Sequence, residues 1–159
     1  MQIIKKQSGM ALFVSLIFLL LLTIFGVAAM QNAGVQEKMA GNVKLKNETF
    51  QLAERALREG ENYILDVAHE GDLATCDECV GDNCRVPAIT GGLVETDGVC
   101  DVWRSAASGN TFYQLQKLGG SSAAVNVQVG SSVVLYRVTA VSYQGNARTA
   151  LESIYAHSN

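Results

Sequence analysis

A long segment near the N-terminus carries no charge, and this feature constrains the chain more than any other. Residues 7–36 contain no Asp, Glu, Lys or Arg, and Met10 to Met30 is apolar apart from one Ser, one Thr and one Gly. As an α-helix, residues 10–30 span about 30 Å, the thickness of a bilayer core. The segment is apolar on every face, which argues against a buried helix of a soluble core. The sequence therefore predicts a membrane-spanning helix.

The residues before this segment predict its orientation. Lys5 and Lys6 precede it and no acidic residue does, which favours a cytoplasmic N-terminus and a periplasmic C-terminal part. A secretory signal peptide has a similar layout, but its apolar region is shorter, roughly 7 to 15 residues. Helical patterning also continues past the small residues that could form a cleavage site. A plain uncleaved membrane anchor is a further alternative.

The composition fits one compact domain beyond the membrane segment. The chain has 159 residues, of which 48% are hydrophobic, so composition does not indicate disorder. The net charge of -3 argues against a nucleic-acid partner for this chain alone.

A helical period continues after the apolar segment, over residues 31–67. Apolar residues recur at steps of three, four and seven, and charged residues occupy the opposite face, with Glu54 and Arg58 as an i,i+4 pair. The apolar stripe consists of Val35, Met39, Val43, Phe50, Ala53, Leu57 and Ile64. We expect one long helix from about Met10 to about Val67, whose distal half packs on a core and whose proximal half needs neighbouring subunits or lipid. Any bend is expected at Gly34, Gly41 or Gly60, since glycine weakens a helix by about 1 kcal/mol relative to alanine.

Four cysteines lie on the predicted periplasmic side, where thiols oxidise: Cys76, Cys79, Cys84 and Cys100. Their even number favours two disulfides, and three pairings are possible. A bridge from Cys100 to one of the other three would stabilise the fold by roughly 3 kcal/mol. Zinc held by four thiolates is an alternative, although a second Cys-x2-Cys is missing. A redox site formed by Cys76 and Cys79 is a further alternative, although no βαβ pattern surrounds these residues.

The region around the cysteines is acidic. Nine acidic residues lie between Asp66 and Asp101, against the single base Arg85, which is typical of a solvated loop. The carboxylates of Asp77, Glu78 and Asp82 offer oxygen ligands for calcium, but no EF-hand spacing is present. We therefore expect no metal site.

The C-terminal part predicts strands. The expected strands are 111–118, 125–129, 133–143 and 147–155, with a turn at Gln144-Gly145-Asn146. Together with the helix, they predict an α+β fold with a small antiparallel sheet.

No catalytic motif is present. His69 and His157 are isolated, and the chain has no P-loop, HExxH or GxSxG sequence. We expect neither enzymatic activity nor a cofactor.

The N-terminus resembles a known processing signal. Gln7-Ser8-Gly9-Met10, after the two lysines and directly before the apolar run, is similar to the class III signal of type IV prepilins. The resemblance implies that prepilin peptidase cleaves between Gly9 and Met10 and methylates the new amine of Met10. The expected organisation is then a leader over 1–9, a membrane or filament-core helix over 10–30, its amphipathic continuation over 31–67 and a periplasmic domain over 68–159.

A longer segment resembles one pilin family. The run from Met39-Ala-Gly-Asn to Phe50-Gln-Leu-Ala-Glu-Arg-Ala-Leu-Arg-Glu-Gly60 looks like the N-terminal signature of PilX-type minor pilins. The resemblance implies a ladle-shaped pilin and a low-abundance subunit that helps to initiate a type IV pilus for adhesion or twitching motility. It implies as partners the other minor pilins, the major pilin, the prepilin peptidase, the inner-membrane assembly platform and, before assembly, the lipid bilayer.

One residue departs from the major-pilin pattern. Major pilins carry a glutamate at the fifth mature position, where its carboxylate pairs with a neighbour's N-terminal amine. If Met10 is the first mature residue, the fifth is Val14, which cannot neutralise an amine. An unpaired amine in a low-dielectric core is costly, so a subunit without this carboxylate suits the tip of a filament better than the shaft.

Two other functions fit parts of the sequence. A type II secretion pseudopilin would share the N-terminal helix. A membrane-anchored periplasmic redox or binding protein would use Cys76 and Cys79.

Overall fold

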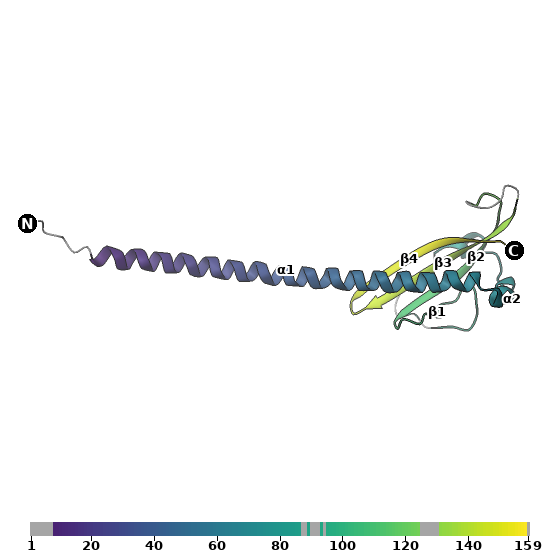
Figure 1. Cartoon of the computed structure of the whole chain (residues 1–159), viewed down its shortest axis with the longest axis horizontal. Coiled ribbons are helices and arrows are strands. Elements are labelled where there is room, and N and C mark those ends of the chain that lie inside the picture. Colours follow the sequence, from purple (N-terminus) through teal and green to yellow (C-terminus); the bar gives the residue numbers. More distant parts are fainter. Residues whose placement is uncertain (1–7, 87–88, 90–92, 94, 125–130, 159) are drawn as a thin grey trace, which may run out of the picture. The chain divides into compact units, whose positions relative to one another are not determined.

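The computed structural model describes residues 8–86, 89, 93, 95–124 and 131–158. Its elements are α1 (Ser8–Leu65), η1 (Val67–His69), α2 (Glu70–Ala74), η2 (Gly81–Cys84), β1 (Arg104–Ser105), β2 (Thr111–Ser121), β3 (Val133–Gln144) and β4 (Ala147–His157) (Figure 1). The strands form one antiparallel sheet in the order β1-β2-β3-β4. The predicted α+β arrangement, a long helix packed on an antiparallel sheet, is confirmed.

The chain divides into two compact units at residue 43. The first contains α1 up to Val43, and every described side chain from Met10 to Val43 is exposed. The second contains the rest of α1 together with the sheet and the hydrophobic core.

The end of α1 is close to the predicted one. The helix stops at Leu65, two residues before the expected end, because Asp66 adopts an extended conformation and caps the next turn. The Asp66 side chain accepts a hydrogen bond from the Ala68 amide at 3.0 Å, as N-cap residues do. The predicted pair of Glu54 and Arg58 is present, with 3.2 Å between Oε1 and Nη2.

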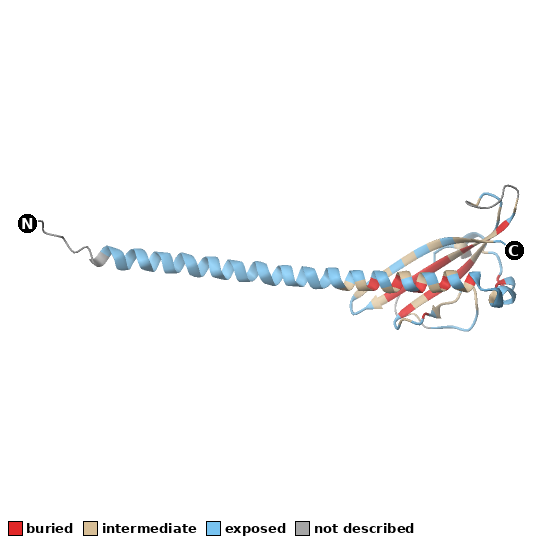
Figure 2. Cartoon of the chain, in the orientation of Figure 1, coloured by how far each residue is buried: buried red, intermediate tan, exposed pale blue. Residues whose placement is uncertain are grey.

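Small residues dominate the face of α1 that packs on the sheet. The buried positions of this face are Thr49, Ala53, Ala56, Gly60 and Ile64 (Figure 2). They follow steps of three and four, so they share one side of the helix. Of the predicted stripe, Ala53 and Ile64 are buried, but the prediction was wrong for Phe50, which is 48% exposed. The reason is that Thr49, rather than Phe50, continues the row of small residues toward the sheet.

Gly60 marks the closest approach of α1 to the sheet. A Cβ atom at this position would lie 2.6 Å from Cγ1 of Val138 and 3.1 Å from Cδ2 of Tyr113. Only a residue without a side chain therefore allows this helix–sheet distance. The glycine lowers the helix propensity of α1 at this position, but the close contact that it allows buries Val138 and Tyr113.

Polar contacts fix the position of α1 along the sheet. Ser142 donates a hydrogen bond to the carbonyl of Thr49, and the Thr149 hydroxyl donates to the Thr49 hydroxyl at 2.9 Å. Farther along, Ser153 donates to the Glu61 carboxylate at 2.6 Å. These bonds satisfy polar groups at the helix–sheet boundary. The Thr49–Thr149 and Glu61–Ser153 contacts also show that β4 runs in the same direction as the packed segment of α1, because the residue numbers increase together along both elements.

Three of the four predicted strands are confirmed. The described strands extend the predicted segments 111–118, 133–143 and 147–155 by one to three residues. The predicted turn also forms, with Gly145 at a φ of 57° between β3 and β4. The predicted strand over 125–129 lies outside the described residues. β1 was not predicted, because two residues carry no periodicity and form a strand through pairing with Phe112 and Tyr113.

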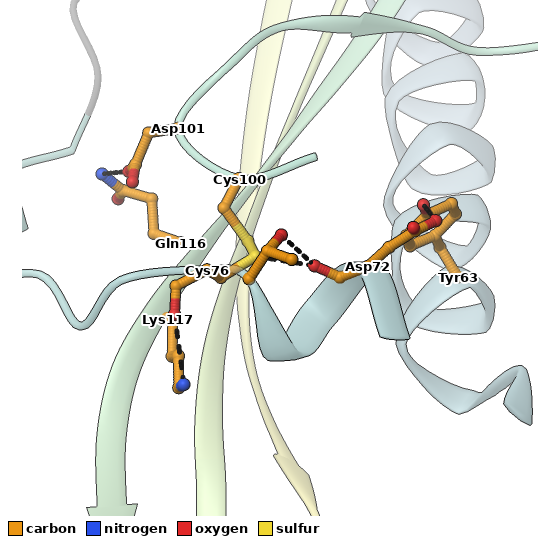
Figure 3. Close-up of a disulfide and its surroundings, with 8 residues drawn as sticks. Tyr63, Asp72, Cys76, Cys100, Asp101, Gln116 and Lys117 are labelled. Carbon is orange, nitrogen blue, oxygen red and sulfur yellow. Dashed lines mark hydrogen bonds between the residues drawn. A yellow bond between two sulfur atoms is a disulfide. The ribbon is translucent and has the colours of Figure 1, made fainter. Parts of the chain in front are cut away.

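A disulfide-linked loop lies along the edge of β2 and against the face of the sheet opposite α1. Cys76 is bonded to Cys100 and Cys79 to Cys84. Backbone amides of the loop bond to β2, from Cys79 to the carbonyl of Lys117 at 2.8 Å. The Lys117 ammonium in turn donates to the carbonyl of Cys76 at 3.1 Å (Figure 3).

Polar side chains of the sheet connect it to this loop. The amide nitrogen of Gln116 donates to the Asp101 carboxylate at 3.1 Å (Figure 3). The guanidinium of Arg137 donates to the carbonyl of Cys84 at 2.6 Å and to the amide oxygen of Gln116 at 3.2 Å. The face of the sheet toward the loop is thus largely polar.

Replacing Gly60 by alanine should destabilise the globular unit. The added Cβ overlaps Val138, and overpacking of this kind typically costs about 1–3 kcal/mol, more than the gain in helix propensity. Unfolding of the full chain in detergent, followed by fluorescence of its single tryptophan, Trp103, measures the change. Gly71→Ala in α2 is the control, because nothing lies within 4 Å of its Cβ position. Equal stability of the two variants would contradict the close packing.

The two disulfides should contribute unequally to stability. The Cys76–Cys100 bond has a sequence separation of 24 and the Cys79–Cys84 bond one of 5. In the chain-entropy model, these loops correspond to about 3 and about 2 kcal/mol. The double alanine variants of each pair, compared by urea unfolding, should show that order. Alkylation of the denatured, unreduced wild type should label no cysteine, and labelling of all four would overturn the pairing.

Candidate functional site

The N-terminal part of α1 is the candidate site for insertion into a membrane or a filament. Within the described residues, one helix is long and apolar enough to cross a membrane, and none of its most apolar window, of mean hydropathy 2.8, is buried. Ser15 and Thr23 interrupt the apolar surface, but their hydroxyls donate to the carbonyls of Leu12 and Leu20 at 2.8 and 2.7 Å. The segment therefore presents no unpaired hydroxyl to an apolar environment.

The predicted processing residues lie at the start of α1. The helix begins at Ser8, so the bond between Gly9 and Met10 belongs to its first turn. Val14 lies in the same helix and is 44% exposed. No acidic residue is present in the first turn of α1, and Glu37 is the first acidic residue of the helix.

An exposed apolar surface extends beyond the span. Val35, Met39 and Val43 are 52%, 63% and 57% exposed, and they lie on one side of α1 at a spacing of four. Phe50, at the beginning of the globular unit, is also exposed. This apolar side of the helix has no partner within the described chain, which fits a surface that other molecules cover.

The cysteines do not form the alternative sites. Cys76 and Cys79 belong to two different disulfides, so the sequence Cys76-Asp-Glu-Cys79 is not a Cys-x2-Cys redox pair. All four sulfurs are bonded in pairs, which is incompatible with a four-thiolate zinc site in this structure.

The acidic residues considered for calcium are not brought together. Asp82 pairs with Arg85 at 2.8 Å, and the carboxyl group of Glu78 lies beside Gly119. Across the described part of the chain, no group of three or more His, Cys, Asp or Glu side chains could hold a metal ion.

One aromatic and charged cluster was missed by sequence reasoning. His69 stacks on Tyr63 with ring centroids 3.7 Å apart, and the guanidinium of Arg104 lies 4.4 Å from the centre of the Tyr63 ring. Arg104 also contacts Tyr113, whose pKa burial raises above its ordinary value, so the phenol stays neutral. Arg104 and Tyr113 are distant in sequence from Tyr63 and His69, so no local pattern could reveal the cluster. Tyr113 belongs to the hydrophobic core and Tyr63 packs against it, so the stacking and cation–π contacts join Arg104 and His69 to the core.

The comparisons with known proteins bear on the N-terminal helix. The family model described as PilX N-terminal matches residues 8–58. No curated protein and no solved structure matches the chain. The match covers the apolar segment with Gly9, Met10 and Val14, and the small-residue face of α1 as far as Ala56. It points to a protein related to the type IV pilus and to a structural rather than an enzymatic family. Residues 8–58 are therefore similar to the N-terminal region of PilX-type type IV pilins.

Proposed function

We propose that this chain is a minor pilin that helps to initiate type IV pilus assembly as part of a tip complex. The observation that carries the proposal is the combination of a PilX-type N-terminal region with Val14 in place of a carboxylate. The first feature relates the chain to the pilus, and the second distinguishes it from a subunit that repeats along the shaft.

The physical argument concerns the N-terminal amine. After cleavage at Gly9, the amine of Met10 carries a positive charge at the end of an apolar helix. Transfer of an ion into a low-dielectric core costs several kcal/mol unless a partner of opposite charge is present. A repeating subunit must therefore bring a carboxylate for its neighbour's amine, and residues 8–36 of this chain contain none.

A subunit at the tip escapes this requirement. Its own amine receives the glutamate of the subunit below, while its Val14 faces no further amine. The same subunit inserted into the shaft leaves one amine without a partner. Each filament can therefore accept one copy of this chain, at its tip. There the chain helps the other minor pilins and the major pilin to begin a filament on the assembly platform.

The proposed route begins in the inner membrane. Lys5 and Lys6 hold the leader in the cytoplasm and the globular unit in the periplasm, where the two disulfides form. Prepilin peptidase removes residues 1–9 and methylates Met10, and the helix then leaves the bilayer for the filament. The pilus at the cell surface serves adhesion or twitching motility.

Processing should be visible in the intact mass of the protein. Chain extracted from membranes should begin at Met10 with an N-methyl group, because the glycine lies between the basic leader and the apolar run. Deletion of the peptidase gene, or the variant Gly9→Val, should leave the leader in place. Recovery of wild-type chain that still begins at Met1, in cells with active peptidase, would defeat the proposal.

The position in the filament follows from Val14. Immunogold label on sheared pili should lie at one end of each filament. Val14→Glu supplies the missing carboxylate and should allow the chain into the shaft, while Val14→Leu is the matched apolar control and should keep the end label. Wild-type label spread along the shaft would sink the tip assignment.

A further inference from the structure

A cavity lies between α2 and the sheet, beyond the end of α1. The helix α1 ends at Leu65, and α2 packs Leu73 into the same hydrophobic core. Between α2 and the strands β2, β3 and β4 the structure has a cavity of about 280 Å³. Its lining includes Glu70 and Leu73 of α2 and Lys117, Val134, Tyr136 and His157 of the strands. All of these residues belong to the globular unit.

The register of the strands brings the lining residues of the sheet together. Lys117 of β2 is the direct partner of Tyr136 of β3, and Val134 of β3 is the direct partner of His157 of β4. Val134 and Tyr136 are two residues apart in one strand, so they share a face of the sheet. On β2, the residue opposite Val134 is Gly120, so this strand places no side chain beside Val134. The cavity therefore has a floor of two neighbouring cross-strand pairs.

Tyr136 gives this floor a buried hydroxyl. The residue is 4% exposed, and its hydroxyl forms no hydrogen bond with the residues that the structure describes. Burial raises the pKa of the Tyr136 phenol above its ordinary value, so the group keeps its proton at neutral pH and can donate. Buried polar groups normally have a hydrogen-bond partner. An acceptor bound in the cavity would supply one.

Lys117 gives the floor a half-buried positive charge. Its ammonium donates to the carbonyl of Cys76 at 3.1 Å, which is a neutral partner (Figure 3). Within the described ranges of the chain, Lys117 forms no ion pair. An ammonium has three donors, and a charge that is removed from water is stabilised by a counter-ion. The Lys117 ammonium can therefore bind an anion in addition to the Cys76 carbonyl.

Glu70 does not change the sign of this site. It is exposed at the first position of α2, whereas Lys117 is half-buried on the floor. Charges in contact with solvent interact several times more weakly than buried ones, because the effective dielectric constant is higher and salt screens them. The floor of the cavity is therefore positive and rich in donors, while Leu73 and Val134 give it apolar walls.

We propose that this cavity binds a small organic carboxylate, whose charged group contacts Lys117 and Tyr136 and whose apolar body packs on Leu73 and Val134. One ammonium balances the single charge of a carboxylate, and the apolar walls disfavour a small inorganic anion. A volume of about 280 Å³ corresponds to roughly nine water molecules of about 30 Å³ each, which limits the ligand to a similar number of non-hydrogen atoms. The inference is independent of the proposed function, because it uses only residues of the globular unit.

Titration of the full chain in detergent with isovalerate, followed by NMR, tests the site. Saturable shifts of the signals of Lys117, Val134 and Tyr136 are expected, with a Kd in the millimolar range or tighter. Isovaleramide has the same shape without the charge and should bind at least about tenfold more weakly, because charge-assisted hydrogen bonds are lost. Isoamylamine should not bind. Absence of saturable shifts with isovalerate, or equal or tighter binding of the amide or the amine, would overturn the inference.

Substitutions in the cavity separate binding from folding. Tyr136→Phe removes the hydroxyl and no described hydrogen bond, so it should weaken isovalerate binding severalfold and keep the unfolding midpoint. Tyr155→Phe, at its direct partner on β4 and outside the cavity lining, is the matched control and should keep the wild-type affinity. Lys117→Gln should weaken binding at least about tenfold. Equal affinities of Tyr136→Phe and Tyr155→Phe would overturn the assignment, as would wild-type affinity of Lys117→Gln.

Discussion

The globular unit depends on the close approach of α1 to the sheet. Ala53, Ala56 and Gly60 remove side-chain volume from one side of the helix, so that strands β2 and β3 can pack directly on its backbone. Polar contacts at Thr49 and Glu61 then fix the helix along β4. Since α1 covers one face of the sheet, the disulfide-linked loop is left with the other face and with the edge of β2. Among the described strands, β4 forms the edge of the sheet opposite β1.

The N-terminal part of α1 follows a different constraint. It is uncharged as far as Gln36, its hydroxyls are bonded within the helix, and its apolar surface has no partner in the described chain. Such a surface is stable only in lipid or against other apolar helices. The proposed tip position rests on its lack of a carboxylate, because burial of an unpaired amine is more costly than any gain from apolar packing at one residue.

Much of the fold was predictable from periodicity, and the exceptions have physical reasons. The helix and the strands that begin at 111, 133 and 147 were predicted because their patterns are long and regular. The packed side of α1 was predicted in part: hydrophobicity favoured Phe50, whereas close packing selected its small neighbour Thr49. The disulfide pairing and β1 could not be predicted, because both depend on segments far apart in sequence. The processing residues Gly9 and Met10 are proposed from resemblance, because the fold itself does not mark a cleavage site.

The number of copies of this chain per filament tests the central claim most directly. Quantitative mass spectrometry of sheared pili, sorted by length in the electron microscope, gives the ratio of this chain to the major pilin. A subunit confined to the tip predicts a fixed number of copies per filament, so the ratio should fall in inverse proportion to length. A ratio that stays constant as filaments lengthen would place the chain in the shaft and contradict the account.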